Sequence, residues 1–467
     1  MVRHPRYRKN NLFSKVSVCL FLSAALIGGI INFFRKQDCW QDIIDNSVLQ
    51  GKTLSLAVKE LKTAKNDITA YLLEDNANPI VSIDFIFKNA GSISDDKGKQ
   101  GLSRMVSLLL TEGAGDYDTE TLKEELDLKA ISITFSAGKD DFGGSLLTTK
   151  DNLAKAIYFL NLMLTSPRFD EDDILRIKQQ MKEAILRQKE HPANELQLEF
   201  AEEVYGQHPY SENYLGRISD IEKLSKKDLS EFVSNSLSKR NLVVGIAGDV
   251  TPSEAKTVLE DAFDDLPSIG KVDFVRNAEI KFDGRTKSLQ RTVGQNMLLA
   301  AMPSVGRNHD DFYPLFVANH IWGGSGLTSK LAKEIRERQG LTYSIYSYLS
   351  LDDKAPLMLV GFSATKENFA KAKKMLINEI VNFAKNGIDE QDLIKAKNSL
   401  VASYNLRFAS IQNIAQILTA MQKYNLGLDF LQKRNEYIKQ INLEQVNEVI
   451  RKYFNDKKII TIEIGEF

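Results

Sequence analysis

The order of hydrophobic and polar positions along this chain predicts strands and helices in a regular succession. The first clear strand is Ile80–Phe87, IVSIDFIF, whose partly alternating and partly continuous apolar pattern is typical of a largely buried strand. A loop rich in glycine and charge follows it, and 102–110 then reads as an apolar helix that ends near Gly113. Apolar, β-prone runs predict closing strands at 242–248 and 459–465.

Predicted helices outnumber predicted strands, and most of the strands come in hairpin-like pairs. Further strands are expected around 54–61, 68–73, 131–135, 143–148, 296–302, 342–350 and 357–363. Helices are expected over 119–126, 152–164, 169–189, 195–205, 225–237, 312–321 and 327–338, and from residues 368, 390, 410, 428 and 443. This succession favours an α+β fold in which mainly antiparallel sheets pack against long helices.

The pattern is written twice along the chain. TKDNLAKA at Thr149–Ala156 returns as TKENFAKA at Thr365–Ala372, an offset of 216 residues. FDEDDILRIKQ from Phe169 returns as IDEQDLIKAKN from Ile388, and the two closing strands are 217 residues apart. A period of this length is far too long for a solenoid repeat, so the chain is expected to contain two homologous domains in tandem.

This duplication sets the expected domain organisation. We expect a basic tail and a signal anchor in 1–36, a polar stalk at 37–52, a first domain at 53–266, a linker at 267–290, and a second domain at 291–467.

The N-terminal segment has the pattern of a signal sequence. Basic residues between positions 3 and 15 precede Val16–Phe34, which carries no charge, and Arg35 and Lys36 follow it. Nineteen uncharged residues are enough to cross a bilayer, so residues 16–34 predict an uncleaved anchor. The larger number of basic residues before the anchor places the N-terminus in the cytoplasm and the two domains outside.

Composition and charge exclude several classes of function. Lys and Arg (61) nearly balance Asp and Glu (62), which argues against nucleic-acid binding. Cys19 and Cys39 both precede the duplicated body, so neither domain can hold a disulfide or a thiolate metal site. None of the five histidines has the i, i+3 or i, i+4 spacing of a helical metal-binding pair, so no metal site is expected.

One pair of residues in the second half is a candidate for chemistry. Arg336 and Tyr343 lie seven residues apart in RERQGLTYSIY, where Gly340 is expected to end a helix and a strand to begin. The arginine can simply cap the helix while the tyrosine packs in the core. Alternatively, a cation and a phenol converge on an anionic oxygen, an arrangement that stabilises a developing oxyanion.

Three motifs carry a resemblance to a known family. They are Gly101-Leu102-Ser103, HPYSENYLG at His208–Gly216 and KEIRERQGLTYSIYS at Lys333–Ser347. With the duplication, they make residues 53–467 resemble the insulinase/pitrilysin family of zinc metallopeptidases, in its bacterial, two-domain, mitochondrial-processing-peptidase-like branch. The resemblance implies that the chain forms half of a clam-shell chamber and that a peptide substrate adds to a sheet edge as an extra strand.

The sequence departs from this family at the zinc motif. Where the resemblance implies His-x-x-Glu-His, the chain has Arg104, Ser107 and Leu108. A permanent cation cannot ligate zinc, a serine cannot act as the general base at neutral pH, and leucine has no lone pair. The family's third ligand falls near Glu183 or Ala184. The chain is therefore expected to bind no metal.

The family's substrate-binding Arg and Tyr match Arg336 and Tyr343. In heterodimeric members, one subunit carries the zinc motif and the other carries this pair. We therefore expect a non-metal-binding subunit, inactive alone, whose partner supplies His-x-x-Glu-His and zinc. Two alternatives remain, a catalytically inactive peptide-binding or scaffold protein and a peptidase active by itself.

For a bacterial member of the family, the predicted anchor implies an inner-membrane protein whose domains face the periplasm. The alternative is secretion to the periplasm after cleavage of the signal.

Overall fold

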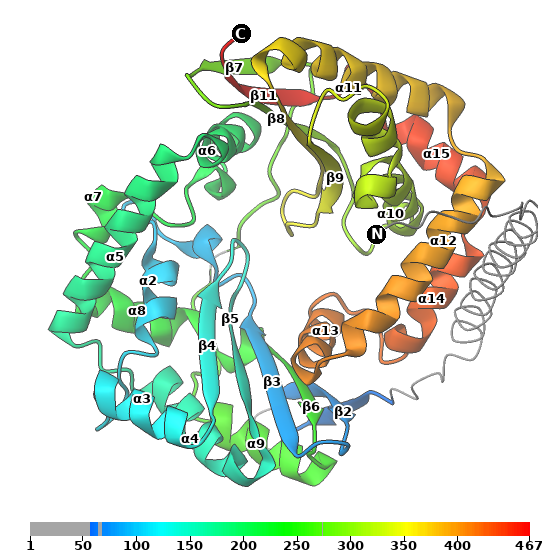
Figure 1. Cartoon of the computed structure of the whole chain (residues 1–467). Helices are drawn as coiled ribbons and strands as arrows, with labels where there is room; N and C mark the ends of the chain where they lie inside the picture. The colour runs from blue at the N-terminus through cyan, green and yellow to red at the C-terminus, as the bar shows by residue number, and fades with distance from the viewer. Residues whose placement is uncertain (1–56, 64–67, 273) are drawn as a thin grey trace, which may run out of the picture. The chain divides into compact units, whose positions relative to one another are not determined.

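The computed structural model describes residues 57–63, 68–272 and 274–467, which belong to one compact unit (Figure 1). Two sheets organise this unit. The first has the strand order β1-β2-β6-β3-β5-β4, and the second has the order β7-β11-β8-β10-β9. The strands of the first sheet are β1 (Lys59–Lys62), β2 (Thr69–Glu74), β3 (Ile80–Phe87), β4 (Ser132–Ala137), β5 (Phe142–Thr149) and β6 (Leu242–Gly248). Those of the second are β7 (Thr286–Gln290), β8 (Asn296–Pro303), β9 (Ser344–Ser350), β10 (Leu357–Ala364) and β11 (Ile460–Gly465).

The two sheets repeat one topology. In each, the last strand of the half is inserted between two earlier strands, β6 between β2 and β3 and β11 between β7 and β8. Each inserted strand pairs parallel with one neighbour, β6 with β2 and β11 with β7. The other strand pairs are antiparallel. The predicted fold class, α+β with two mainly antiparallel sheets, is confirmed. The finer domain boundaries, including the linker at 267–290, stay a prediction.

Helices pack on the sheets in both halves. In the first half they are α2 (Leu102–Leu109), α3 (Thr119–Leu128), α4 (Leu153–Thr165), α5 (Glu171–Glu190), α6 (Pro192–Tyr205), α7 (Ile218–Ile221), α8 (Lys226–Ser236) and α9 (Pro252–Phe263). In the second half they are α10 (Phe312–Asn319), α11 (Lys366–Asn386), α12 (Glu390–Asn405), α13 (Ile411–Lys423), α14 (Phe430–Gln440) and α15 (Leu443–Tyr453).

One predicted helix is wrong in form. The segment 327–338 is not a continuous α-helix but a short 3₁₀ turn, η6 (Gly326–Thr328), followed by a π-helical segment, η7 (Ala332–Glu337). Ser329 separates them because its hydroxyl donates to the Gly326 carbonyl and accepts from the Ala332 amide. Such side-chain bonds to the backbone compete with regular helical bonding.

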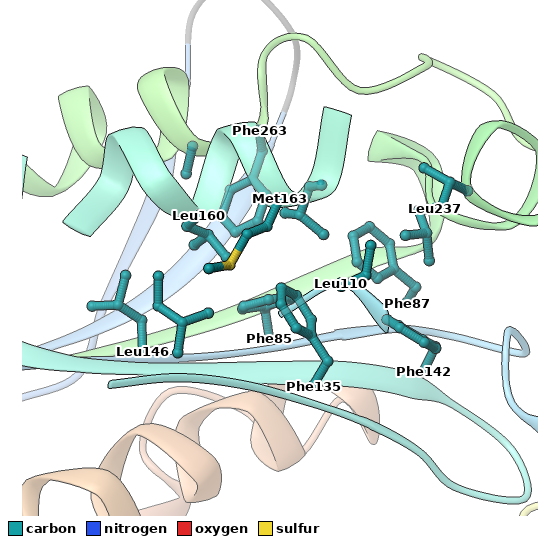
Figure 2. Packing of buried hydrophobic residues seen from close by; sticks show 14 of the residues in the cluster. Phe85, Phe87, Leu110, Phe135, Phe142, Leu146, Leu160, Met163, Leu237 and Phe263 are labelled. Carbon is teal, nitrogen blue, oxygen red and sulfur yellow. The ribbon is translucent and has the colours of Figure 1, made fainter. Parts of the chain in front are cut away.

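The core of the first half is rich in aromatic residues (Figure 2). Phe85 of β3 lies at its centre, with its ring 5.4 Å from Phe263 of α9 and 6.1 Å from Phe135 of β4, both edge to face. Leu160 and Met163 of α4 cover the same face of the sheet. Burial of such large rings contributes strongly to the hydrophobic stabilisation here.

The two halves exchange helices. From the first half, α6 packs on β8 and β11 of the second sheet, and from the second half, α13 packs on β2, β3 and β6 of the first (Figure 1). Close approach of α13 requires Gly245 of β6, because a Cβ there would lie 2.3 Å from the Ala415 carbonyl oxygen. Gln422 of α13 donates to the Thr69 carbonyl and accepts from the Val244 amide. Each sheet therefore buries one face against a helix from the other half.

The predicted location in a membrane is contradicted. In the part of the chain that the structure describes, no helix is both long and apolar enough to cross a bilayer. The longest helices there, α5 and α11, are amphipathic and carry many charged residues, which a bilayer core would not accommodate. The segment 16–34, on which the anchor was predicted, lies outside the described residues.

Candidate functional site

The helix that corresponds to the family's zinc helix is α2. It begins after Gly101, whose positive φ of 97° is an allowed conformation for glycine. The Asp95 carboxylate accepts from the backbone amides of Gly101 and Ser103, both at 2.9 Å, and so anchors the start of the helix. Burial raises the pKa of the Asp95 carboxyl to about 7, although these hydrogen bonds act in the opposite direction.

Two of the degenerate motif positions on α2, Ser107 and Leu108, make structural contacts through their side chains. The buried Ser107 hydroxyl donates to the Arg104 carbonyl at 2.8 Å, and Leu108 packs against the core of the first half. On α5, Glu183 is exposed and accepts a hydrogen bond from Gln179. Within the described ranges, no three His, Cys, Asp or Glu residues are grouped so as to hold a metal ion. The residues at this position do not fit zinc.

The structure brings Arg336 and Tyr343 together. The Arg336 Nε donates to the backbone carbonyl of Tyr343 at 2.8 Å, which orients the guanidinium. The Tyr343 side chain is 76% exposed. Both residues line a cavity of about 390 Å³, together with Thr342, Thr365 and Asn368 among others.

Local structure explains this geometry. Arg336 lies in η7, whose π-helical turn is a form often found at functional sites. Gly340 takes a positive φ of 62° and its amide bonds to the Arg336 carbonyl, which turns the chain at the end of the helical segment. The Thr342 hydroxyl then binds the backbone of Ser344 and Ser363 and so fixes the start of β9. The interpretation of Tyr343 as a core residue is wrong, because its ring faces solvent.

A second cavity, which sequence reasoning missed, lies between the halves of the unit. It has a volume of about 400 Å³ and is bounded by α6 on one side and by β8, β9 and β10 on the other. Tyr346 and Tyr348 line it, with stacked rings 6.2 Å apart. The signal in the sequence is the alternation of SIYSYLS, in which the two tyrosines share one face of the strand.

An ionic network joins the loops at the ends of the two sheets. Lys423 of α13 contacts Asp141 of the β4–β5 turn at 2.5 Å and Asp353 of the β9–β10 turn at 2.8 Å. Burial lowers the pKa of Lys423, but the two carboxylates outweigh it, so the pKa is raised overall. Tyr210, from the motif at 208–216, donates to the Asp140 carboxylate and accepts from the Lys354 amide. This motif therefore has a structural role.

Comparison with known proteins agrees with this description. The model of the peptidase M16 inactive domain matches residues 223–400. A protein of Helicobacter pylori named "Non-peptidase homolog YmxG" is 27% identical over 402 residues, which cover 85% of this chain and 91% of that protein. The chain resembles the M16 peptidase family. The predicted resemblance to the insulinase/pitrilysin peptidases, in a form without the zinc-binding motif, is confirmed.

Other relatives of this M16 homologue carry different names. A Bacillus subtilis protein named "Uncharacterized zinc protease YmxG" is 21% identical and covers 79% of this chain and 90% of its own length. The crystal structure of a peptidase M16 inactive domain from Pseudomonas fluorescens superposes with a TM-score of 0.82 at 25% identity, covering 88% of this chain and 98% of that chain.

Proposed function

We propose that this M16 homologue is the non-metal-binding subunit of a two-chain zinc peptidase. One observation carries the proposal. Arg336 and Tyr343 share an open cavity in which the arginine is held by a backbone hydrogen bond and the phenol is exposed, while Ser107 and Leu108 on α2 serve packing. A pair of donors arranged in this way suits a substrate carbonyl that a second chain presents.

The division of labour follows from the residues present. The partner would hold zinc and the general base on its own His-x-x-Glu-His helix, because Arg104, Ser107 and Leu108 can supply neither. In this chain, the Arg336 guanidinium would bind the peptide backbone and orient it. The Tyr343 hydroxyl would donate a hydrogen bond to the oxygen that gains charge during attack.

A test begins with the partner. The tagged full-length chain is purified from its native cells, any stoichiometric companion is identified by mass spectrometry, and both chains are then produced separately. The proposal expects a companion with His-x-x-Glu-His, and cleavage of a fluorogenic peptide only when both chains are mixed. A companion without that motif, or a companion that is fully active alone, would contradict it.

A second candidate function is peptide binding without cleavage, in which the chain acts as a scaffold. The cavity between α6 and β9 favours this candidate, because it lies within one chain and needs no partner. The two candidates differ in one respect. A scaffold binds peptides but gives no cleavage with any companion.

A further inference from the structure

Strand β9 forms an edge of the second sheet. Among the described strands it pairs with β10 alone, so alternate backbone groups along its other side are open to a further strand. Ile345 and Ser347 are buried, whereas the tyrosines between and after them, Tyr346 and Tyr348, remain 46% and 45% exposed. Two large stacked rings left this exposed on one face of an edge strand are typical of a binding surface.

The opposite wall of the cavity is apolar and comes from the first half of the chain. Leu196 and Phe200 of α6 form this wall, and Leu299 and Leu359 of the second sheet line the side of the cavity that carries the tyrosines. All four side chains belong to one buried cluster, which makes this wall rigid. A volume of about 400 Å³ accommodates one large side chain of a ligand together with part of its backbone.

The charged residues at this cavity have partners. Lys139 lies 2.8 Å from Asp352, and Glu212 pairs with Arg217 at 2.6 Å. The rest of the lining consists mainly of tyrosine, serine, amide and apolar side chains. A charged ligand side chain would therefore lose its hydration here without gaining a free counter-ion, which disfavours it.

The cavity adjoins the Arg336–Tyr343 site. The cavity lined by Tyr346 and Tyr348 is called the aromatic cavity below. Ser344 and Ser363, which face each other in the register of β9 and β10, also line it. Their chain neighbours Tyr343 and Ala364 line the other cavity. β9 begins next to Tyr343 and, at roughly 3.3 Å per residue, extends for about 20 Å along the aromatic cavity.

From this geometry we infer that the cavity selects one bulky uncharged side chain, aromatic or branched aliphatic, in an extended peptide that lies along the edge of β9. The selected residue lies within a few positions of the part of the peptide that reaches Arg336 and Tyr343. The inference rests on the proposed function, which makes the ligand a peptide substrate. It adds which side chain of that peptide the subunit prefers.

The test measures binding rather than cleavage, so it requires no partner. The full-length chain is titrated with labelled decapeptides that share a Ser/Gly-rich sequence and differ only at one central position, Phe or Asp. Fluorescence anisotropy should show the Phe peptide binding at least about tenfold more tightly, as one well-packed aromatic contact allows. The double variant Tyr346→Ser/Tyr348→Ser should lose that preference, while Tyr348→Phe should keep it.

A matched control is Tyr158→Ser, which removes a tyrosine of similar exposure (47%) on α4, away from the residues that line the cavity. It should leave the preference for Phe unchanged, and thermal unfolding confirms that each variant is folded. Equal binding of the Phe and Asp peptides, or no binding of either, would overturn the inference. These outcomes are independent of the cleavage assay with the partner, which judges the proposed function separately.

Discussion

At the scale of single residues, several polar side chains are buried, and the packing around them explains their properties. Asp84 of β3 is one of them. It lies where α13 of the other half packs on the first sheet, and burial raises the pKa of its carboxyl to about 6, partly opposed by a hydrogen bond from Thr419. Helix exchange between the halves therefore changes the ionisation of a strand residue.

Stability should fall with rising pH because of Asp84. The folded-state pKa, about 6, lies above the ordinary value of 3.8, so the unfolded chain releases this proton first. The free energy of unfolding should therefore decrease as pH rises from about 4 to about 6, by at most about 1.4 kcal/mol per pH unit from this group.

The measurement is urea unfolding at several pH values for the wild type and for Asp84→Asn. The variant should have a flatter pH dependence in that window, whereas Asp127→Asn, an exposed position on α3, should not alter it. An identical slope in wild type and Asp84→Asn would show that Asp84 is not the responsible group.

At the scale of elements, the sequence predicts strands with characteristic apolar runs most accurately. Strand β3 is found at Ile80–Phe87 and β6 at Leu242–Gly248, as predicted. The prediction of a continuous helix over 327–338 is wrong because the Ser329 side chain forms local hydrogen bonds with the backbone. Helical periodicity in the sequence does not reveal such bonds. The sheet on which α6 or α13 packs could not be predicted either, because an amphipathic pattern shows that one face of a helix is buried but not which sheet buries it.

The same limits apply to the candidate site. The sequence predicts that Arg336 and Tyr343 are close, since Gly340 turns the chain between them. It does not predict that the contact runs through the Tyr343 carbonyl, which leaves the phenol free. The aromatic cavity depends on the packing of α6 across the second sheet, so it could not be found before the tertiary structure was known.

The packing of α13 on β6 should be sensitive to a single methyl group. In Gly245→Ala, the new Cβ would lie 2.3 Å from the Ala415 carbonyl oxygen and 2.7 Å from the Thr419 amide, so the helix must shift. We expect a loss of about 1–3 kcal/mol in the free energy of unfolding, measured by urea denaturation. Gly294→Ala, where nothing lies within 4 Å of the added Cβ, should be close to neutral. Equal stability of the two variants would contradict this account of the packing.

At the scale of the whole molecule, the two halves depend on each other. The helix exchange and the ionic network around Lys423 both connect elements that are far apart in the sequence. Neither half can bury both faces of its sheet without the other. We therefore expect residues 57–467 to unfold as one cooperative unit rather than as two independent domains.

Replacing Lys423 should destabilise this unit. In Lys423→Met, Asp141 and Asp353 lose the cation that they share, and two partly buried carboxylates remain without a counter-ion between them. Removing one partner of such an ion pair typically costs about 3–5 kcal/mol. The midpoint of urea unfolding should fall accordingly, and adding Asp141→Asn and Asp353→Asn should recover much of the loss.

The matched control is Lys433→Met, which breaks an exposed i, i+4 pair with Asp429 on the same half of the chain. Exposed pairs contribute about 0–1 kcal/mol, so this variant should remain near the wild type. A similarly small effect of Lys423→Met would mean that the network does not hold the halves together.

The proposed role in catalysis is tested best by the turnover number of the reconstituted pair, with Tyr343→Phe compared with wild type. Tyr158→Phe, a change of the same kind on α4, serves as the control. If the Tyr343 phenol stabilises the developing oxyanion, Tyr343→Phe should reduce kcat by roughly 100- to 1000-fold while the two chains still associate. Undiminished kcat in the assembled Tyr343→Phe pair would contradict the proposed role of this residue.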